Sequence, residues 1–143
     1  MSVELPFAPV DTLIREHAGD LRVSADAAEA LAKRIQERGA ALAVDAAERA
    51  NADGRKTLMA ADFSVNDRPD KRTLTLPIAP VDRIARLDID SRYRVSMEAR
   101  VALAGRLEAF AREAADGAAT LARHAGRRTV QAEDIETYFE LVE

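Results

Sequence analysis

The feature that most constrains this chain is that it states one pattern twice. Residues 5–11 (LPFAPVD) return as residues 76–82 (LPIAPVD), and RVS at 22–24 returns at 94–96. RKT at 55–57 returns as RRT at 127–129, so the two copies differ in register by a single residue. A period of about 70 residues is longer than the roughly 20–50 residues of solenoid repeats. The pattern predicts two copies of one small helical domain, fused head to tail.

The length of each copy predicts that the two share one core. A domain of about 60 residues buries only about 60% of the surface of its unfolded chain, which leaves it marginally stable. The whole chain has 143 residues, so neither copy is large enough to be comfortable alone. We expect the first domain at 1–65, a polar, proline-containing linker at 66–75, and the second domain at 76–143.

The apolar spacing predicts an all-α fold in which each copy is a short helix, a long helix and a short helix. In the first copy, the short helix contains Pro9 in its first turn and ends near Gly19. The long helix starts after Ser24 as its N-cap and ends near Gly54. About two further turns of helix are expected over 58–65.

The second copy repeats this plan with a longer end. We expect the short helix over 80–89, the long helix from its N-cap Ser96 to Gly126, and a last helix from about Gln131. A long helix flanked by two short ones cannot cover its own apolar stripe. The other copy is the expected cover.

Composition excludes several classes of protein. The chain has no cysteine, which removes disulfides and cysteine-based nucleophiles or metal sites. No apolar run approaches the roughly 20 residues of a membrane span, and no signal pattern opens the chain, so we expect a cytoplasmic protein without a membrane partner. His17 and His124 lie in unlike contexts, and neither a metal-ligand spacing nor a phosphate-binding glycine loop is present. We therefore expect no enzyme, no small-molecule substrate, no metal and no cofactor.

The charges give two opposing indications. The net charge is −4 and neither copy has a basic excess, which argues against a general polyanion binder. Nearly all the basic residues are arginine, with lysine only at 33, 56 and 71. Arginine suits bidentate contacts with phosphate, but a GC-rich genome produces the same bias, so both explanations stay open.

Three segments of the second copy resemble the archaeal histones. They are LPIAPV at 76–81 followed by Arg83, RVS at 94–96, and above all LARHAGRRTVQAEDIE at 121–136. The resemblance extends over almost the whole chain, twice, and the arrangement is similar to the fused doublet histones of salt-loving archaea. It implies two histone folds that pair within one polypeptide as an intramolecular handshake pseudo-dimer. It also implies a chromosome-associated protein whose partner is double-stranded DNA.

The resemblance implies three sites on that DNA. The first loop of each copy would lie beside the second loop of the other and hold the phosphate backbone, and the paired short helices would form a third site. Arg83 matches the arginine that enters the minor groove, whereas its counterpart in the first copy is Thr12. The implied DNA-binding residues are Arg15, Arg22, Lys56, Thr57, Arg83, Arg86, Arg94, Arg128 and Thr129.

Two arginine–aspartate pairs match a clamp of the same family between the second loop and the last helix. They are Arg55 with Asp62 and Arg127 with Asp134. We interpret both pairs as mainly structural rather than as phosphate ligands.

The resemblance also implies self-association of doublets through the second fold only. Leu121, His124 and Asp134 match the family's contact between neighbouring dimers. The first copy has Arg49 and Ala52 where the second has Leu121 and His124. A lone histidine at a helix end is also often a capping or surface residue, and that alternative stays open for His124.

Two functions remain from different classes. The first is a chromatin protein that binds and bends or wraps duplex DNA through its backbone, with little sequence specificity. The second is a histone-fold regulatory or protein-interaction module with weak DNA affinity. The loop arginines, lysine and threonines favour the first, and the acidic balance favours the second.

Overall fold

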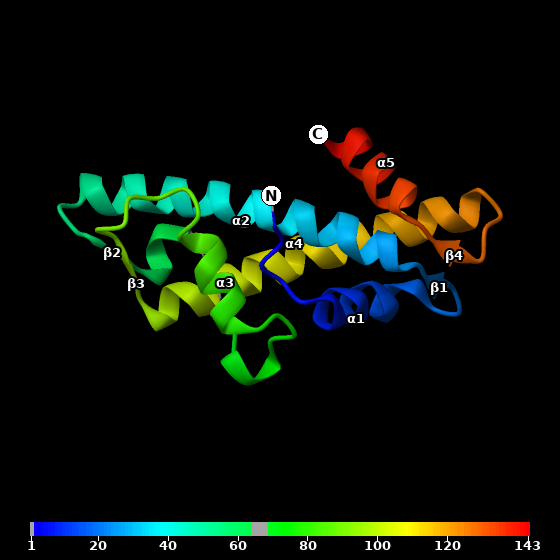
Figure 1. Cartoon of the computed structure of the whole chain (residues 1–143), viewed down its shortest axis with the longest axis horizontal. Coiled ribbons are helices and arrows are strands. Elements are labelled where there is room, and N and C mark those ends of the chain that lie inside the picture. Colours follow the sequence, from blue (N-terminus) through cyan, green and yellow to red (C-terminus); the bar gives the residue numbers. More distant parts are fainter. Residues whose placement is uncertain (1, 64–68) are drawn as a thin grey trace.

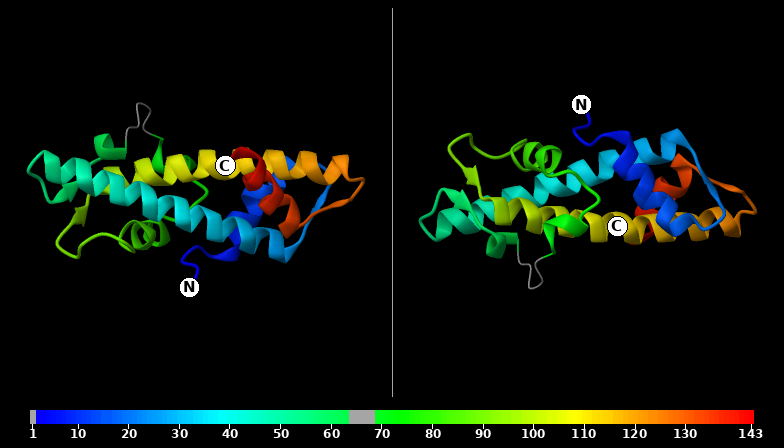
Figure 2. Two further views of the ribbon diagram at one scale, coloured as in Figure 1. Left: turned by 90° about the horizontal axis from the view of Figure 1, so that it is seen from above. Right: turned by 90° about the horizontal axis from the view of Figure 1, so that it is seen from below.

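Two long helices form the centre of the molecule. The structure is a computed structural model that describes residues 2–63 and 69–143. Helices α2 (Ala25–Ala52) and α4 (Met97–His124) run along the long axis and cross (Figures 1 and 2). The other described helices are α1 (Phe7–Ala18), α3 (Ile78–Ala85), α5 (Ala132–Val142) and the 3-10 turns η1 (Ala60–Phe63) and η2 (Lys71–Thr73). No helix in this described part of the chain is both long and apolar enough to cross a membrane.

Two short parallel strand pairs join the repeats to each other. Strand β1 (Arg22–Val23) pairs with β4 (Thr129–Val130), and β2 (Thr57–Leu58) pairs with β3 (Arg94–Val95). Each pair therefore connects the loop before one long helix to the loop after the other. The two pairs lie at opposite ends of the long axis (Figure 1).

The repeats share one apolar core, as their size predicts. Helix α1 packs on α4 of the other repeat as well as on its own α2, and α5 packs on both long helices. Small residues let the long helices approach closely. At Gly39 of α2, an added Cβ would lie 2.7 Å from Cγ2 of Ile84 and 3.1 Å from Cδ1 of Leu107, both in the second repeat. The inner faces of α2 and α4 are accordingly rich in buried alanine.

The predicted ends of the long helices are confirmed. The hydroxyl of Ser24 accepts a hydrogen bond from the N–H of Ala27 at 3.2 Å, and Ser96 accepts one from Ala99 at 3.1 Å. Beyond the helices, Gly54 and Gly126 each adopt a φ of 73°, a left-handed conformation in which a Cβ is unfavourable. The last helix begins after Gln131, as expected.

Two predicted helices were wrong in length. The short helix expected over 80–89 spans Ile78–Ala85, and residues 86–93 form a loop. In that loop the carboxylate of Asp90 accepts from the backbone N–H of Arg92 at 2.8 Å, which favours a turn over further helix. The segment expected as helix over 58–65 contributes Leu58 to β2 and one 3-10 turn.

The rest of that segment and part of the predicted linker lie outside the described residues, which resume at Pro69. Within the linker, Asp70 caps η2 by accepting from the N–H of Arg72 at 2.9 Å.

Two buried polar residues fasten the extended segments that precede the short helices. Gln36 of α2 accepts from the N–H of Glu4 at 2.8 Å and donates to the carbonyl of Ser2 at 2.9 Å. Glu108 of α4 accepts from the N–H groups of Thr75 and Leu76 at 2.6 and 2.9 Å. Gln36 and Glu108 occupy corresponding positions of the two repeats, so a polar residue recurring inside an apolar stripe was the signal in the sequence.

Candidate nucleic-acid interface

Each end of the molecule brings together residues that sequence analysis placed in one site. At the β1–β4 end, the N–H of Arg22 donates to the carbonyl of Arg128 at 2.9 Å, and Arg22 is paired with Thr129. At the β2–β3 end, the N–H of Arg94 donates to the carbonyl of Lys56 at 2.8 Å, and Arg94 is paired with Thr57. These backbone bonds fix the spacing of the charged side chains at both ends.

The cations at the two ends are exposed and lack carboxylate partners. Within the described residues, no Asp or Glu lies within ion-pair distance of Arg22, Lys56, Arg94 or Arg128. The two threonines beside them are partly exposed. Elsewhere most described arginines are already engaged. The side chains of Arg49, Arg106 and Arg123, for example, donate to main-chain carbonyls at 2.7–2.9 Å.

Lys56 is held by neutral groups rather than by a carboxylate. Its ammonium lies 5.0 Å from the centre of the Tyr93 ring, within the range of a cation–π contact. It also donates to Oδ1 of Asn51 at 3.3 Å. The corresponding residue to Tyr93 in the first repeat is Leu21, so the two ends are not chemically identical.

The arginines on the short helices differ from those at the ends, because each is paired with a carboxylate. Arg15 contacts Asp11 at 2.6 Å and Arg86 contacts Asp82 at 3.1 Å, both one helical turn apart. Arg83 contacts Glu4, from the extended segment before α1, at 2.9 Å. The arginines of the predicted third site are therefore exposed but largely neutralised.

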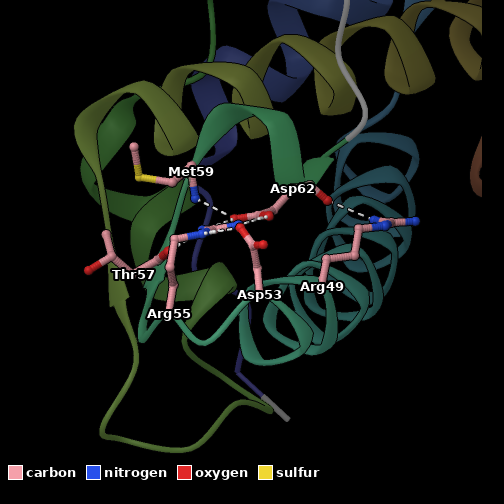
Figure 3. Close-up of polar contacts among 6 residues, drawn as sticks. All are labelled: Arg49, Asp53, Arg55, Thr57, Met59 and Asp62. Carbon is pink, nitrogen blue, oxygen red and sulfur yellow. Dashed lines mark hydrogen bonds and ion pairs between the residues drawn. The ribbon is translucent and has the colours of Figure 1, made fainter.

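One predicted clamp is a bidentate ion pair around a buried carboxylate (Figure 3). The guanidinium of Arg55 donates to both oxygens of Asp62, at 2.8 and 2.9 Å, and to the carbonyl of Thr57 at 2.9 Å. Asp62 also accepts from the N–H of Met59 at 2.7 Å. The hydrogen bond from Arg55 holds the pKa of Asp62 below its ordinary value, although burial acts in the opposite direction.

The second repeat has the equivalent clamp at the start of α5. Arg127 forms an ion pair with Asp134, which also accepts from the N–H of Gln131 at 2.8 Å. Gln131 and Asp134 cap the helix reciprocally. Each clamp thus fastens the loop that carries one of the two end threonines, while the clamp arginines remain about one-third exposed.

The structure places the predicted self-association residues unequally. His124 is exposed at the last residue of α4, and Leu121 is partly exposed one turn earlier. Asp134 is only 2% exposed, and its carboxylate is already engaged by Arg127 and Gln131. In the first repeat, Arg49 donates to the carbonyl of Asp62 at 2.7 Å, beside a single 3-10 turn rather than a full last helix.

Catalytic chemistry has little support in the described residues. Across 2–63 and 69–143, no group of three His, Cys, Asp or Glu side chains could hold a metal ion. A hollow of about 510 Å³ between α2 and α5 is an open groove that is lined largely by charged side chains.

Comparison with known proteins gives matches across both repeats. Residues 3–65 and 74–137 each match the family model described as histone-like transcription factor (CBF/NF-Y) and archaeal histone. The chain is 52% identical over 60 residues to the archaeal histone HAN1 of Thermococcus zilligii, a match that covers 42% of this chain and 87% of that protein.

Solved structures agree with this assignment. The crystal structure of the histone from Methanopyrus kandleri is similar with a TM-score of 0.71 and 27% identity, over 94% of this chain and 92% of that one. A crystal structure from Thermus thermophilus has a TM-score of 0.72 at 17% identity, over 97% of both chains, and shows likeness of fold alone. Two matched segments, each a histone fold, account for most of the described helices and strands. The chain belongs to the family of histone-like transcription factors (CBF/NF-Y) and archaeal histones.

Proposed function

We propose that this protein is a DNA-binding chromatin protein that associates with the chromosome and bends or wraps duplex DNA with little sequence specificity. The observation that carries the proposal is the pair of cationic ends, where Arg22 with Arg128 and Arg94 with Lys56 have no carboxylate partner among the described residues. A cation left unpaired on a chain of net charge −4 is available to an external anion.

The chemistry of the ends suits phosphate rather than base edges. Guanidinium and ammonium groups, a threonine hydroxyl and backbone N–H groups hold phosphate oxygens without reading sequence. The clamps at Asp62 and Asp134 hold the loops on which Thr57 and Thr129 lie, so the spacing of each phosphate site is set before DNA binds. Contacts at both ends of one rigid molecule would favour a bent duplex, because each end holds a separate stretch of backbone.

The proposal includes an intramolecular handshake of two histone folds, with domains at 1–65 and 76–143. It is supported by the crossed strand pairs, by the packing of α1 on α4, and by the match of one Methanopyrus histone chain to both repeats. A handshake formed within one chain needs no second subunit to complete either phosphate site.

A regulatory or protein-interaction module with weak DNA affinity is the second candidate. The net charge of −4 and the carboxylates beside Arg15, Arg83 and Arg86 favour it, since both reduce the attraction of DNA. The two candidates differ in one measurable property, which is affinity for duplex DNA at low salt.

The test is a charge reversal at both ends, Lys56→Glu with Arg128→Glu, measured by fluorescence anisotropy on unrelated duplexes across a salt series. We expect weaker binding to every sequence alike, and a slope of log affinity against log salt reduced by about 2, since each lost phosphate contact removes about 0.9. The matched control is Lys33→Glu with Lys71→Glu, which has the same change in charge away from the strand pairs.

The control should retain the wild-type slope, and circular dichroism should show that both double variants fold. Unchanged affinity of the end variant at low salt would favour the regulatory module instead.

We also propose that doublets associate through the second repeat and stop at two chains. A two-fold interface uses the same patch on both molecules, so one competent patch per chain closes the assembly. Leu121 and His124 offer an apolar and a hydrogen-bonding group on α4, beside a full α5. In the first repeat, Arg49 would face its own symmetry mate, and like charges brought together are unfavourable.

A further inference from the structure

The ion pair between Arg83 and Glu4 differs from its neighbours. The pairs of Arg15 and Arg86 lie one turn apart within a single helix, as is common on exposed helices. Arg83 instead meets a carboxylate from the other repeat, at 2.9 Å between Nε and Oε1. The Arg83 side chain is 54% exposed and that of Glu4 is 24% exposed, so the pair lies at the surface where an external anion can reach it.

The position of Glu4 is built into the fold. Its backbone N–H donates to Oε1 of Gln36 at 2.8 Å, and Nε2 of Gln36 donates to the carbonyl of Ser2 at 2.9 Å. Gln36 is 1% exposed, so this amide has no access to water and anchors the extended segment firmly. The carboxylate of Glu4 is therefore delivered to Arg83 by a buried hydrogen-bonding group, not by a freely moving tail.

The other side of the molecule lacks both members of the pair. The residue that corresponds to Arg83 is Thr12, and the residue that corresponds to Glu4 is Thr75. The backbone anchor is nevertheless retained there, because Glu108 accepts from the N–H of Thr75 at 2.6 Å. The carboxylate is thus not required to fasten the segment, and it is present only where an exposed arginine faces it.

We propose that Glu4 is an internal competitor of DNA for Arg83. The inference rests on the proposed function, and it assigns to one residue the strength of the central contact. In the free protein Glu4 neutralises Arg83, and a DNA phosphate must displace this carboxylate or approach it against repulsion. Either course weakens binding, since an exposed ion pair and an exposed like-charge approach each cost a modest amount in water. The four unpaired cations at the ends then supply most of the affinity.

The test is a double-mutant cycle on the full chain, with Glu4→Gln, Arg83→Gln and both together. Affinity for one duplex is measured by fluorescence anisotropy over a salt series. We expect Glu4→Gln to raise affinity about two- to fivefold at about 0.1 M salt. It should also steepen the salt slope by about one, as one further phosphate contact would. In the Arg83→Gln background, Glu4→Gln should change affinity much less, because the group it masks is gone.

Three outcomes would overturn the inference: no change or a loss of affinity with Glu4→Gln, or an equal gain in both backgrounds, which would be a general effect of charge. Thermal unfolding of each variant checks the fold, and glutamine retains the backbone bond to Gln36. Absence of wild-type binding at low salt would instead overturn the proposed function, so the two failures are distinguishable.

A second pair of variants repeats the test on the opposite side. Thr12→Arg adds an arginine where no carboxylate corresponds to Glu4, and Thr12→Arg with Thr75→Glu restores the competitor. We expect a gain in DNA affinity with the first variant and a smaller gain with the second. Equal gains would contradict masking by this segment of the chain.

Discussion

Substitution of Gly39 tests directly whether the two repeats share one core. A Cβ at this position would lie 2.7 Å from Ile84 and 3.1 Å from Leu107, both in the second repeat. Gly39→Leu adds four carbons where there is no room for one. Overpacking of this kind costs about 1–3 kcal/mol, and we expect the upper end, whereas replacing a helical glycine by leucine returns about 0.8 kcal/mol. The net loss in free energy of unfolding should be about 2 kcal/mol.

The assay is thermal and urea unfolding followed by circular dichroism. For a chain of this size, about 2 kcal/mol lowers the Tm by roughly 4–8 °C. Ala41→Leu, an exposed position on the same helix, is the matched control and should change stability by less than about 0.5 kcal/mol. The loss at Gly39 should shrink in an Ile84→Ala background, because the opposing side chain is truncated. A Gly39→Leu protein as stable as the wild type would refute the close approach.

Two further predictions concern Asp62 and His124. The pKa of Asp62 is lowered by Arg55, so its carboxylate stabilises the fold above about pH 4 and loses that contribution as the pH falls through the lowered pKa. The difference in unfolding free energy between wild type and Asp62→Asn, measured by urea titration, should be full near pH 7 and shrink toward about pH 2; a constant difference would contradict this. His124→Ala should abolish pairs of chains in crosslinking on long DNA, and a wild-type ladder beyond two chains would oppose a single competent patch.

Much of this protein was predictable from its sequence, because the relevant signals are local. The repeat itself defined two domains of one kind, and serine caps and left-handed glycines marked the long helices where the structure has them. The residues that meet at each strand pair were also predicted, but through resemblance to a family rather than through spacing. Helix lengths failed where local turn chemistry opposed periodicity, as at Asp90, whose side chain satisfies the backbone of a turn.

What the sequence could not determine is which charges are left unpaired. Arginines look alike in a sequence, yet Arg22 and Arg128 are free of carboxylates among the described residues, whereas Arg83 is matched with Glu4 across the two repeats. That difference depends on the long-range anchor at Gln36, which brings an extended segment of one repeat beside a helix of the other. Local pattern determined the elements and their caps, because these depend on neighbours along the chain. Tertiary structure decided the available charge, because ion pairs depend on distances between segments far apart in sequence.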